Sequence, residues 1–412
     1  MKNKIEIMAP VGSYESLMAA INAGADSVYF GIGHLNMRSR SSKNFDLEDL
    51  KKITKIAKKN NVKTYLTLNT IVYDDEINYL KKIVDSAKKN NVDAIIACDM
   101  SVINYCREVG MRVHMSTQTN ISNIEAVRFY SKFADVIVLA RELTLKQISN
   151  IVSLIKKENI KGPSGELIKI EIFIHGALCV SISGKCYMSL AQYNYSANRG
   201  ACLQTCRRAY KVIDEETNEE LKIDNKYVMS PKDLCIIRFI DKIIESGVSV
   251  FKIEGRGRSP DYVYQVVKSY KEAIELYNQG KLSSKKISYL EENLKKVFNR
   301  GFWHGGYYLG NKLGEWSGTY GSKATKEKAF IGIVKHYYSK RKIAEIIIQK
   351  EEINISDEIL ITGTTTGVIE SKIKSIMIDG KKIKSVNKGN IVTIPIEKKV
   401  RKNDKVYVLK NK

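Results

Sequence analysis

The chain contains little cysteine, proline or tryptophan, with seven, five and two residues in a total of 412. So few cysteines exclude a disulfide-stabilised scaffold. No apolar run approaches the roughly 20 residues that a membrane helix needs, and the opening MKNKIEIMAPVGS lacks the apolar core of a secretory signal. We therefore expect a cytoplasmic protein without a membrane partner. In that reducing compartment, clustered cysteines bind metal more often than they bind each other.

Positive charge, by contrast, is abundant. Lys and Arg outnumber Asp and Glu by 68 to 45, which gives a formal net charge of +23. Such an excess attracts polyanions and favours nucleic acid as a partner. The chain is also rich in Lys, Ile and Asn, a bias that an AT-rich genome produces without any functional cause.

The first 255 residues alternate short β-branched runs with longer segments of helical periodicity. Segments such as 13–25, 46–61 and 75–91 carry apolar residues at i, i+3, i+4 and i+7 and lysines on the other face. Eight such units, with no glycine-rich phosphate loop after the first strand, favour an α/β fold of the TIM-like (β/α)8 type over an open doubly wound sheet. The predicted strands are residues 5–10, 27–31, 63–69, 94–99, 112–118, 136–142, 170–176 and 249–255.

The predicted organisation has two domains. Residues 1–325 form the barrel domain, with a cysteine-rich insertion at about 176–248 and a helical extension at 260–300. The insertion is expected to hold a hairpin at 210–230 and a helix that starts near Asp233, and a loop this long in a compact domain is usually functional. Residues 299–322 are interpreted as a linker or cover. Short alternating strands in 326–412 predict a small all-β barrel.

Polar side chains follow the predicted strands at their carboxyl ends, where a barrel carries its chemistry. Among these strand-end side chains, cations are more prominent than groups suited to catalysis, and Lys252 is one of the cations. Arginine offers bidentate geometry for carboxylate or phosphate groups, so we expect an acidic small molecule or an RNA phosphate as the ligand. No GxSxG, HExxH or Walker motif marks a nucleophile, a zinc helix or a phosphate loop. The predicted binding residues are Arg38, Asn69, Gln118, Arg141, Lys232 and Arg256.

Four of the seven cysteines lie in HGALCVSISGKCYMSLAQYNYSANRGACLQTCRRAY, which runs from His175 to Tyr210. Their spacing is C-x6-C, fifteen residues, then C-x3-C, which matches neither zinc knuckles nor the ferredoxin run. Soft sulfur ligands suit zinc or an iron–sulfur cluster, and the spacing alone does not choose between them. Four unligated thiols are the third explanation.

The same block resembles the signature of the peptidase U32 family. The resemblance extends over essentially the whole chain, through MAPVGSYESLMAAINAGADSVYFG, VHMSTQTN, VLARELTL, ANRGACLQTCRRAY, SPKDLC and FKIEGRGRSPDYV. It implies oxygen-independent hydroxylation that depends on prephenate, a dicarboxylate, and on a 4Fe–4S cluster. The chain is most similar to the branch that forms 5-hydroxyuridine at wobble position 34 of tRNA. A collagenase-like peptidase, an rRNA hydroxylase and an RNA-binding subunit of a paired U32 hydroxylase are the alternatives.

Residue roles follow from this resemblance. The implied cluster ligands are Cys179, Cys186, Cys202 and Cys206, with Cys235 as an alternative fourth ligand. His175 is the candidate for proton transfer, although it could instead form a hydrogen bond that orients the cysteine loop, and Glu254 is a second catalytic candidate.

The C-terminal domain is expected to bind RNA. Segment 335–342 interleaves cations with two tyrosines that could stack on unpaired bases, and segment 398–405 adds further cations. Solvated β-turns are the alternative explanation. The predicted RNA-binding residues are Tyr337, Tyr338, Lys340, Arg341, Lys342, Lys398, Lys399, Arg401 and Lys402.

Overall fold

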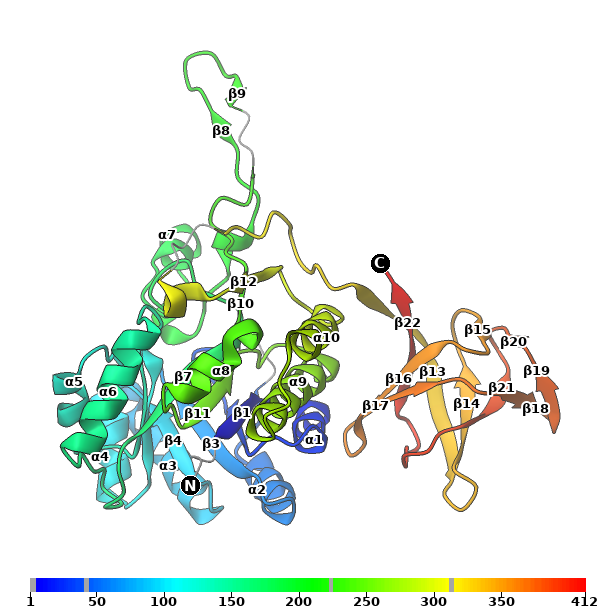
Figure 1. Cartoon of the computed structure of the whole chain (residues 1–412), viewed down its shortest axis with the longest axis horizontal. Coiled ribbons are helices and arrows are strands. Elements are labelled where there is room, and N and C mark those ends of the chain that lie inside the picture. Colours follow the sequence, from blue (N-terminus) through cyan, green and yellow to red (C-terminus); the bar gives the residue numbers. More distant parts are fainter. Residues whose placement is uncertain (1–4, 41–43, 222–224, 311–314) are drawn as a thin grey trace.

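A computed structural model of the chain describes residues 5–40, 44–221, 225–310 and 315–412. Its first part is a closed barrel of parallel strands, because β11 pairs with both β1 and β7. The predicted TIM-like fold and all eight predicted strands are confirmed (Figure 1). The barrel strands are β1 (Glu6–Pro10), β2 (Ser27–Gly31), β3 (Lys63–Leu68), β4 (Ala94–Ala97), β5 (Val113–Met115), β6 (Val136–Val138), β7 (Lys169–Gly176) and β11 (Val250–Ile253).

Helices cover the outside of the barrel, and their ends follow local signals. The side chains of Ser13, Asn123 and Thr144 accept a backbone N–H at a helix start. Asn61 and Asn91 take left-handed φ values of 55° and 56° just after a helix, which explains the Asn-Asn stops. The helices are α1 (Tyr14–Asn22), α2 (Asp49–Lys59), α3 (Ile77–Lys89), α4 (Met100–Glu108), α5 (Ile124–Tyr130), α6 (Leu145–Lys157), α8 (Ile240–Glu245), α9 (Pro260–Asn278) and α10 (Ser284–Lys295). In the described ranges, none of them is long and apolar enough to cross a membrane.

The barrel interior is filled by side chains and is not purely apolar. Its inner cluster consists of Met8, Tyr29, Tyr65, Ala94, Ile96, Val136 and Val250. The tyrosine hydroxyls are satisfied, because Tyr29 donates to the Ile253 carbonyl at 2.8 Å and Tyr65 to Glu6 at 2.7 Å. Above this layer, the interior opens toward the carboxyl ends of the strands.

The cysteine-rich insertion lies over that open end. Its backbone and side chains contact three barrel loops: Ser39 Oγ donates to the Gly200 carbonyl, Ile71 N to the Asn198 carbonyl, and Gln118 Nε2 to Ser183 Oγ. The predicted hairpin projects away from the barrel (Figure 1). Elements of the insertion are α7 (Met188–Tyr193), the short 3-10 turns η3 (Ala197–Arg199) and η4 (Thr205–Arg207), and strands β8 (Val212–Ile213) and β9 (Glu220–Leu221).

Two predictions about this region are wrong. No helix starts near Asp233: residues Asp233–Cys235 form β10, and α8 starts only at Ile240, after the 3-10 turn η5 (Ile237–Phe239). The interpreted linker supplies β12 (Phe302–His304), which pairs with β10, while β10 also pairs with β7. The strand partner comes from a segment much later in the chain, so local sequence around Asp233 could not reveal the strand. The same segment also contains the 3-10 helix η6 (Gly306–Leu309).

The C-terminal region is all-β, as predicted. Its main sheet has the strand order β17-β16-β22-β13-β14-β21-β18-β19 and encloses its own aliphatic core. The strands are β13 (Lys326–Tyr338), β14 (Ile343–Ile348), β15 (Ile353–Asn354), β16 (Glu358–Gly363), β17 (Gly367–Lys372), β18 (Ile376–Ile378), β19 (Lys381–Ile383), β20 (Ser385–Val386), β21 (Ile391–Pro395) and β22 (Lys405–Asn411).

The β domain rests against the outside of the barrel at α1 and α9 (Figure 1). Strand β17, which the sequence did not predict, makes much of this contact. Asn22 Nδ2 donates to the Thr366 carbonyl at 2.9 Å, and Lys328 pairs with Asp261 at 2.5 Å. The basic turn between β13 and β14 therefore belongs to a domain that is fixed on the barrel.

Candidate functional site

A cavity of about 200 Å³ lies at the barrel mouth, between the strand ends and the insertion. It is placed where a (β/α)8 barrel carries its chemistry. Most of the predicted site residues line it, and several unpredicted ones do as well. Its lining includes Tyr29, Arg38, Thr67, Asn69, Ser116, Gln118, Arg141, Phe173, Cys179, Cys186, Cys202, Cys206, Arg207, Lys252, Glu254, Arg256 and Arg258.

The four predicted cysteine ligands all reach this cavity as free thiols. Burial raises the pKa of Cys206 to about 11; the Arg207 guanidinium opposes that rise, and the neighbouring thiols of Cys179, Cys202 and Cys186 add to it. Gly184 and Gly200 have φ values of 81° and 75°, which glycine adopts readily. These two positions let the insertion fold back, so that all four cysteines reach the same cavity.

Cys235, the alternative fourth ligand, lies elsewhere. It is fully buried in β10 and does not line the cavity. Its Sγ is 3.7 Å from the Tyr270 hydroxyl, on the α9 side of the barrel wall. Burial raises its pKa to about 12, so this thiol stays protonated at neutral pH. The placement favours Cys206 over Cys235.

The donor set can be tested against the group that the sequence implies. No group of three or more His, Cys, Asp or Glu side chains among the described residues is arranged to hold a single metal ion. A zinc ion draws four ligands around one centre at about 2.0–2.3 Å. A 4Fe–4S cluster instead binds each thiolate to a different iron atom, so its four sulfurs stand farther apart. Four thiols that line one cavity are a soft donor set that fits such a cluster.

Arginines also line the cavity. Arg141 is held by a hydrogen bond from Nη1 to the Ala177 carbonyl at 3.1 Å, and its guanidinium lies 4.0 Å from the Phe173 ring centroid. Its Nε atom is buried and has no hydrogen-bond partner among the residues that the structure describes. Arg256 Nη1 donates to Thr67 Oγ1 at 2.8 Å, and burial lowers the pKa of Arg256 to about 10. Such incompletely paired donors fit an anionic ligand.

Glu254 is the acidic member of the site. Burial by itself would raise the pKa of this carboxyl, but Arg38, Arg258 and Arg141 lower it to about 2. Its Oε1 accepts a hydrogen bond from Arg38 Nη2 at 2.6 Å. A carboxylate with so low a pKa is a weak base and carries no proton to donate near pH 7. In this structure Glu254 is a counter-ion of the arginines around it, and its catalytic role stays a prediction.

Beneath the arginines lies a buried ion pair that sequence analysis did not identify. Lys252 Nζ is 2.7 Å from Glu171 Oε1, and the two side chains are 6% and 0% exposed. The second oxygen, Glu171 Oε2, has no hydrogen-bond partner within the described ranges. The sequence marks Lys252 as a strand-end cation, but its partner sits on a neighbouring strand and shows no sequence signal.

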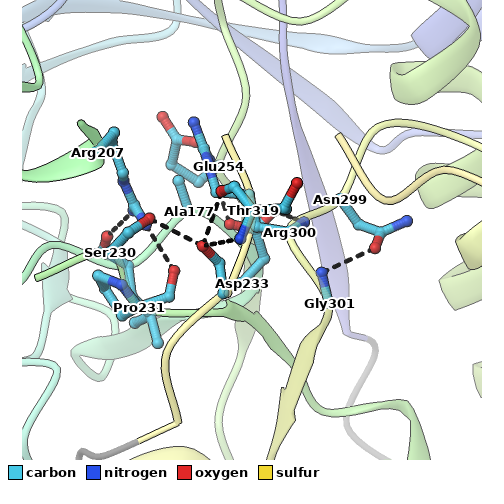
Figure 2. A network of polar contacts seen from close by, with 12 residues as sticks. Ala177, Arg207, Ser230, Pro231, Asp233, Glu254, Asn299, Arg300, Gly301 and Thr319 are labelled. Carbon is cyan, nitrogen blue, oxygen red and sulfur yellow. Dashed lines mark hydrogen bonds and ion pairs between the residues drawn. The ribbon is translucent and has the colours of Figure 1, made fainter. Parts of the chain in front are cut away.

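Sequence analysis did not identify two further arginines. Arg207 lines the cavity and donates from Nη1 to Ser230 Oγ at 3.1 Å and to the Pro231 carbonyl at 2.5 Å (Figure 2). Arg258 also lines the cavity, with its guanidinium 3.5 Å from the Phe298 ring centroid. Arg207 lies in the motif TCRR and Arg258 in GRGR. The position of Arg207 directly after Cys206 is the sequence signal that could have predicted its place at the cavity.

The polar residues Asn69 and Gln118 are brought to the cavity as predicted. Asn69 Oδ1 accepts from the Met37 backbone N–H at 3.3 Å, and its Nδ2 donates to Ser116 Oγ at 3.3 Å. Gln118 Nε2 donates to Ser183 Oγ, whereas its Oε1 is buried without a partner in the described part of the chain. Asn69 thus fixes two loops, and Gln118 retains an acceptor that faces the site.

His175 is not brought to the cavity. Lys252 of β11 pairs with Phe173 of β7, but the next residue, Ile253, pairs with His175, so β7 carries an extra residue at Ile174. This bulge reverses the alternation and turns His175 outward. Its ring is 1% exposed, and Nδ1 lies 3.3 Å from the Tyr270 hydroxyl. Burial lowers the pKa of His175 to about 3, so a proton-transfer role receives no support from the geometry.

Lys232 also lies outside the cavity. Its Nζ pairs with Glu315 at 2.8 Å, and its side chain packs beside Gly301. It precedes β10, which lies between β7 and β12 and outside the closed barrel.

The predicted RNA-binding residues lie on the β domain, and their side chains differ in how exposed they are to solvent. Tyr337 is half-buried and donates its hydroxyl to the Ile396 carbonyl at 3.0 Å, so its ring belongs to the domain core. Tyr338 is 43% exposed. Lys342 pairs with Glu397 at 2.7 Å, and Arg401 Nη1 donates to Thr366 Oγ1 at 3.0 Å. The remaining members are exposed: Lys340, Arg341, Lys398, Lys399 and Lys402.

Comparison with known proteins gives two kinds of relative. The sequence profile described as Peptidase family U32 matches residues 12–318. The chain is 54% identical over 405 residues to a protein named Collagenase from Porphyromonas gingivalis, with 98% of both chains covered. It is 35% identical over 281 residues to tRNA hydroxylation protein P1 of Bacillus subtilis, which covers 66% of this chain and 64% of that protein. It is 33% identical over 306 residues to a 23S rRNA 5-hydroxycytidine synthase of Escherichia coli, with 73% and 44% covered.

Proposed function

The chain belongs to peptidase family U32, and we propose on that basis that it hydroxylates a pyrimidine base of RNA, with uridine 34 of tRNA as the target. Relatives named for tRNA and rRNA hydroxylation support the reaction class. The observation that carries the proposal is the meeting of four thiols and several arginines in one cavity at the barrel mouth. Soft sulfur donors beside anion-binding donors suit a redox centre next to an acidic co-substrate.

The cluster would be held by Cys179, Cys186, Cys202 and Cys206. When bound, a 4Fe–4S cluster supplies electron transfer. The chain's own contribution is to hold the four sulfurs around the cavity and to surround it with positive charge. Arg207, itself part of the insertion, donates to the Leu178 carbonyl at 2.5 Å and so holds two parts of the cysteine loop together.

The acidic co-substrate would be prephenate, bound by Arg141 and Arg256. Both follow barrel strands and line the same cavity, and Glu254 keeps Arg38 in place beside them. A pyrimidine in a stack could not present its C5 atom at the end of a barrel, so the base must leave the stack. Unpaired anticodon-loop bases need less energy for this than paired ones, which favours tRNA over an RNA duplex.

An arginine-to-lysine change tests the anion site. Arg141→Lys keeps the charge but loses the guanidinium fork, so we expect affinity for prephenate to fall by about tenfold. The measurement is the rise in melting temperature that prephenate causes. Arg128→Lys on the exposed face of α5 is the matched control and should behave as wild type. Equal stabilisation of wild type and Arg141→Lys by prephenate would place the site elsewhere.

The β domain would hold the RNA backbone through its exposed cations. Replacing Lys340, Arg341 and Lys342 together by alanine is expected to weaken tRNA binding. The slope of log K against log salt should shrink by about 0.9 for each phosphate that the variant no longer neutralises. Binding is measured by titration at several salt concentrations. The control replaces Lys55, Lys58 and Lys59 on α2, which removes the same charge from another surface. An unchanged slope in the β-domain variant would contradict the assignment.

Peptide hydrolysis is the second candidate, because the relative named Collagenase matches almost the full chain. The cavity offers serines and thiols, but no histidine among the described residues lines it to activate them. Incubation of iron-loaded protein with gelatin separates the two functions. Hydroxylation predicts intact gelatin, and cleavage that persists in Ser116→Ala and Cys179→Ser variants would point to a contaminating protease.

The paired-subunit alternative needs a separate experiment. The chain is produced alone in a host that lacks its own tRNA hydroxylation protein, and the host's tRNA nucleosides are analysed. Appearance of 5-hydroxyuridine would show that the chain acts without a second U32 protein. Its appearance only when a second family member is co-produced would assign the chain to a pair.

A further inference from the structure

The barrel mouth is surrounded by exposed tyrosines. Six tyrosines in the described part of the chain have strongly exposed rings, and four of them belong to loops of the mouth or to the insertion and its neighbours. These four are Tyr73 (52%), Tyr187 (75%), Tyr193 (43%) and Tyr320 (71%). Scattered exposed aromatic residues need no explanation, but a concentration around one cavity does.

Three rings of this region are each stacked with an arginine. The guanidinium carbons of Arg199 and Arg40 lie 4.0 Å from the ring centroids of Tyr73 and Tyr195, and that of Arg208 lies 5.1 Å from Tyr193. These six residues, Arg40, Tyr73, Tyr193, Tyr195, Arg199 and Arg208, are called the aromatic rim.

The rim joins three separate segments of the chain. Tyr73 belongs to the loop after β3, and Arg40 to the loop after β2. Arg199 of the insertion donates to the Ile71 carbonyl at 2.8 Å and pairs with Glu76, which fixes the insertion against the β3 loop. Hydrogen bonds from Arg199 lower the pKa of Glu76 to about 2, and burial opposes this effect without cancelling it. The Tyr73 ring is therefore held on a rigid base.

The second part of the rim is the pair of Arg208 and Tyr193. Arg208 is exposed and donates a hydrogen bond to the Tyr193 hydroxyl. Arg208 comes two residues after Cys206 and next to Arg207, both of which line the cavity, so the chain leads from the cavity to the rim.

We propose that the aromatic rim is the platform on which unpaired RNA bases stack beside the base that enters the cavity. An arginine on one face of a tyrosine keeps the ring oriented, while its exposed part remains available for a base. Exposed guanidinium groups next to the rings can contact phosphate, as single-stranded RNA requires and an uncharged peptide does not. This inference rests on the proposed function, and it moves base recognition from the β domain to the barrel.

The test measures binding of the full chain to a labelled RNA hairpin with an unpaired loop, and to a blunt RNA duplex of the same length. The Tyr73→Ala/Tyr193→Ala variant should bind the hairpin at least about tenfold more weakly, with little change on the duplex. The Tyr73→Phe/Tyr193→Phe variant keeps both rings and should stay within about twofold of wild type. Tyr289→Ala removes an equally exposed ring on α10 and is the matched control.

Each other outcome has a definite meaning. If wild type binds the hairpin and the alanine variant binds it equally well, the rim is not the platform, and the proposed function is unaffected. If wild type binds neither RNA, the proposed function fails and the inference fails with it. If the alanine variant instead loses binding to gelatin, the rim is a peptide surface. A phenylalanine variant as weak as the alanine variant would overturn stacking as the cause.

Discussion

Replacement of Cys186 by serine is expected to remove both the cluster and the RNA modification. Anaerobically prepared wild-type protein should be brown and contain about four irons and four sulfides per chain. Serine oxygen is a hard, weakly acidic donor that replaces a thiolate poorly, so Cys179→Ser and Cys202→Ser should give the same colourless protein. The measurements are the visible spectrum, the iron content and the nucleosides of RNA exposed to each variant.

Two cysteines outside the cavity serve as controls. Cys98→Ser should keep the full cluster, since its Sγ contacts the Asn69 carbonyl at 3.2 Å and does not line the cavity. Cys206→Ser should lose the cluster and Cys235→Ser should keep it. The reverse result for this last pair would contradict the ligand set while leaving the cluster itself in place. Colour and iron that survive in Cys186→Ser would contradict the cluster site.

Replacement of Lys252 by methionine is expected to destabilise the barrel by about 3–5 kcal/mol, because Glu171 would remain as a buried charge without a partner. The free energy of unfolding is measured by urea titration. Lys252→Met/Glu171→Leu removes both charges and should recover most of the loss. Lys268→Met on the exposed face of α9 is the matched control and should change stability by less than about 0.5 kcal/mol.

The pH dependence of the Lys252→Met variant gives a second check. Burial raises the pKa of Glu171 and Lys252 opposes this rise, so loss of the lysine raises the pKa further. A group with a raised folded-state pKa contributes stability below its unfolded pKa of about 4.5, and that contribution is lost as pH rises. The deficit against wild type should therefore be small near pH 4.5 and largest at neutral pH. A deficit independent of pH would show that poorer packing, and not the unpaired carboxylate, is its cause.

The barrel was predictable because each strand–helix unit has local sequence patterns of its own. Helical periodicity, asparagine stops and eight short apolar runs are local patterns, and polar residues at strand ends place the cavity without any knowledge of tertiary structure. Arg38, Arg141 and Arg256 reach the cavity for this reason. The density of the four cysteines in one loop marks them as a group, while their common function comes from the family resemblance.

The remaining errors have non-local causes. The bulge at Ile174 turns His175 away from the interior, and no property of the sequence IEIFIHG indicates an extra residue in the ladder. Strand β10 depends on a partner, β12, that follows a long stretch of chain. Tyr337 lies in a basic segment that is typical of RNA binding. In the folded domain its ring packs against the core and its hydroxyl donates to the Ile396 carbonyl. The sequence marks Glu254 as a catalytic candidate, and its pairing with Arg38 becomes visible only in the folded chain.

The most direct test of the account is nucleoside mass spectrometry of tRNA from a strain that lacks this gene. The account predicts that 5-hydroxyuridine and its derivatives disappear, that the wild-type gene restores them, and that the Cys186→Ser gene does not. An unchanged nucleoside profile in the deletion strain, with every hydroxylated pyrimidine of tRNA and rRNA still present, would contradict RNA hydroxylation as the function of this chain.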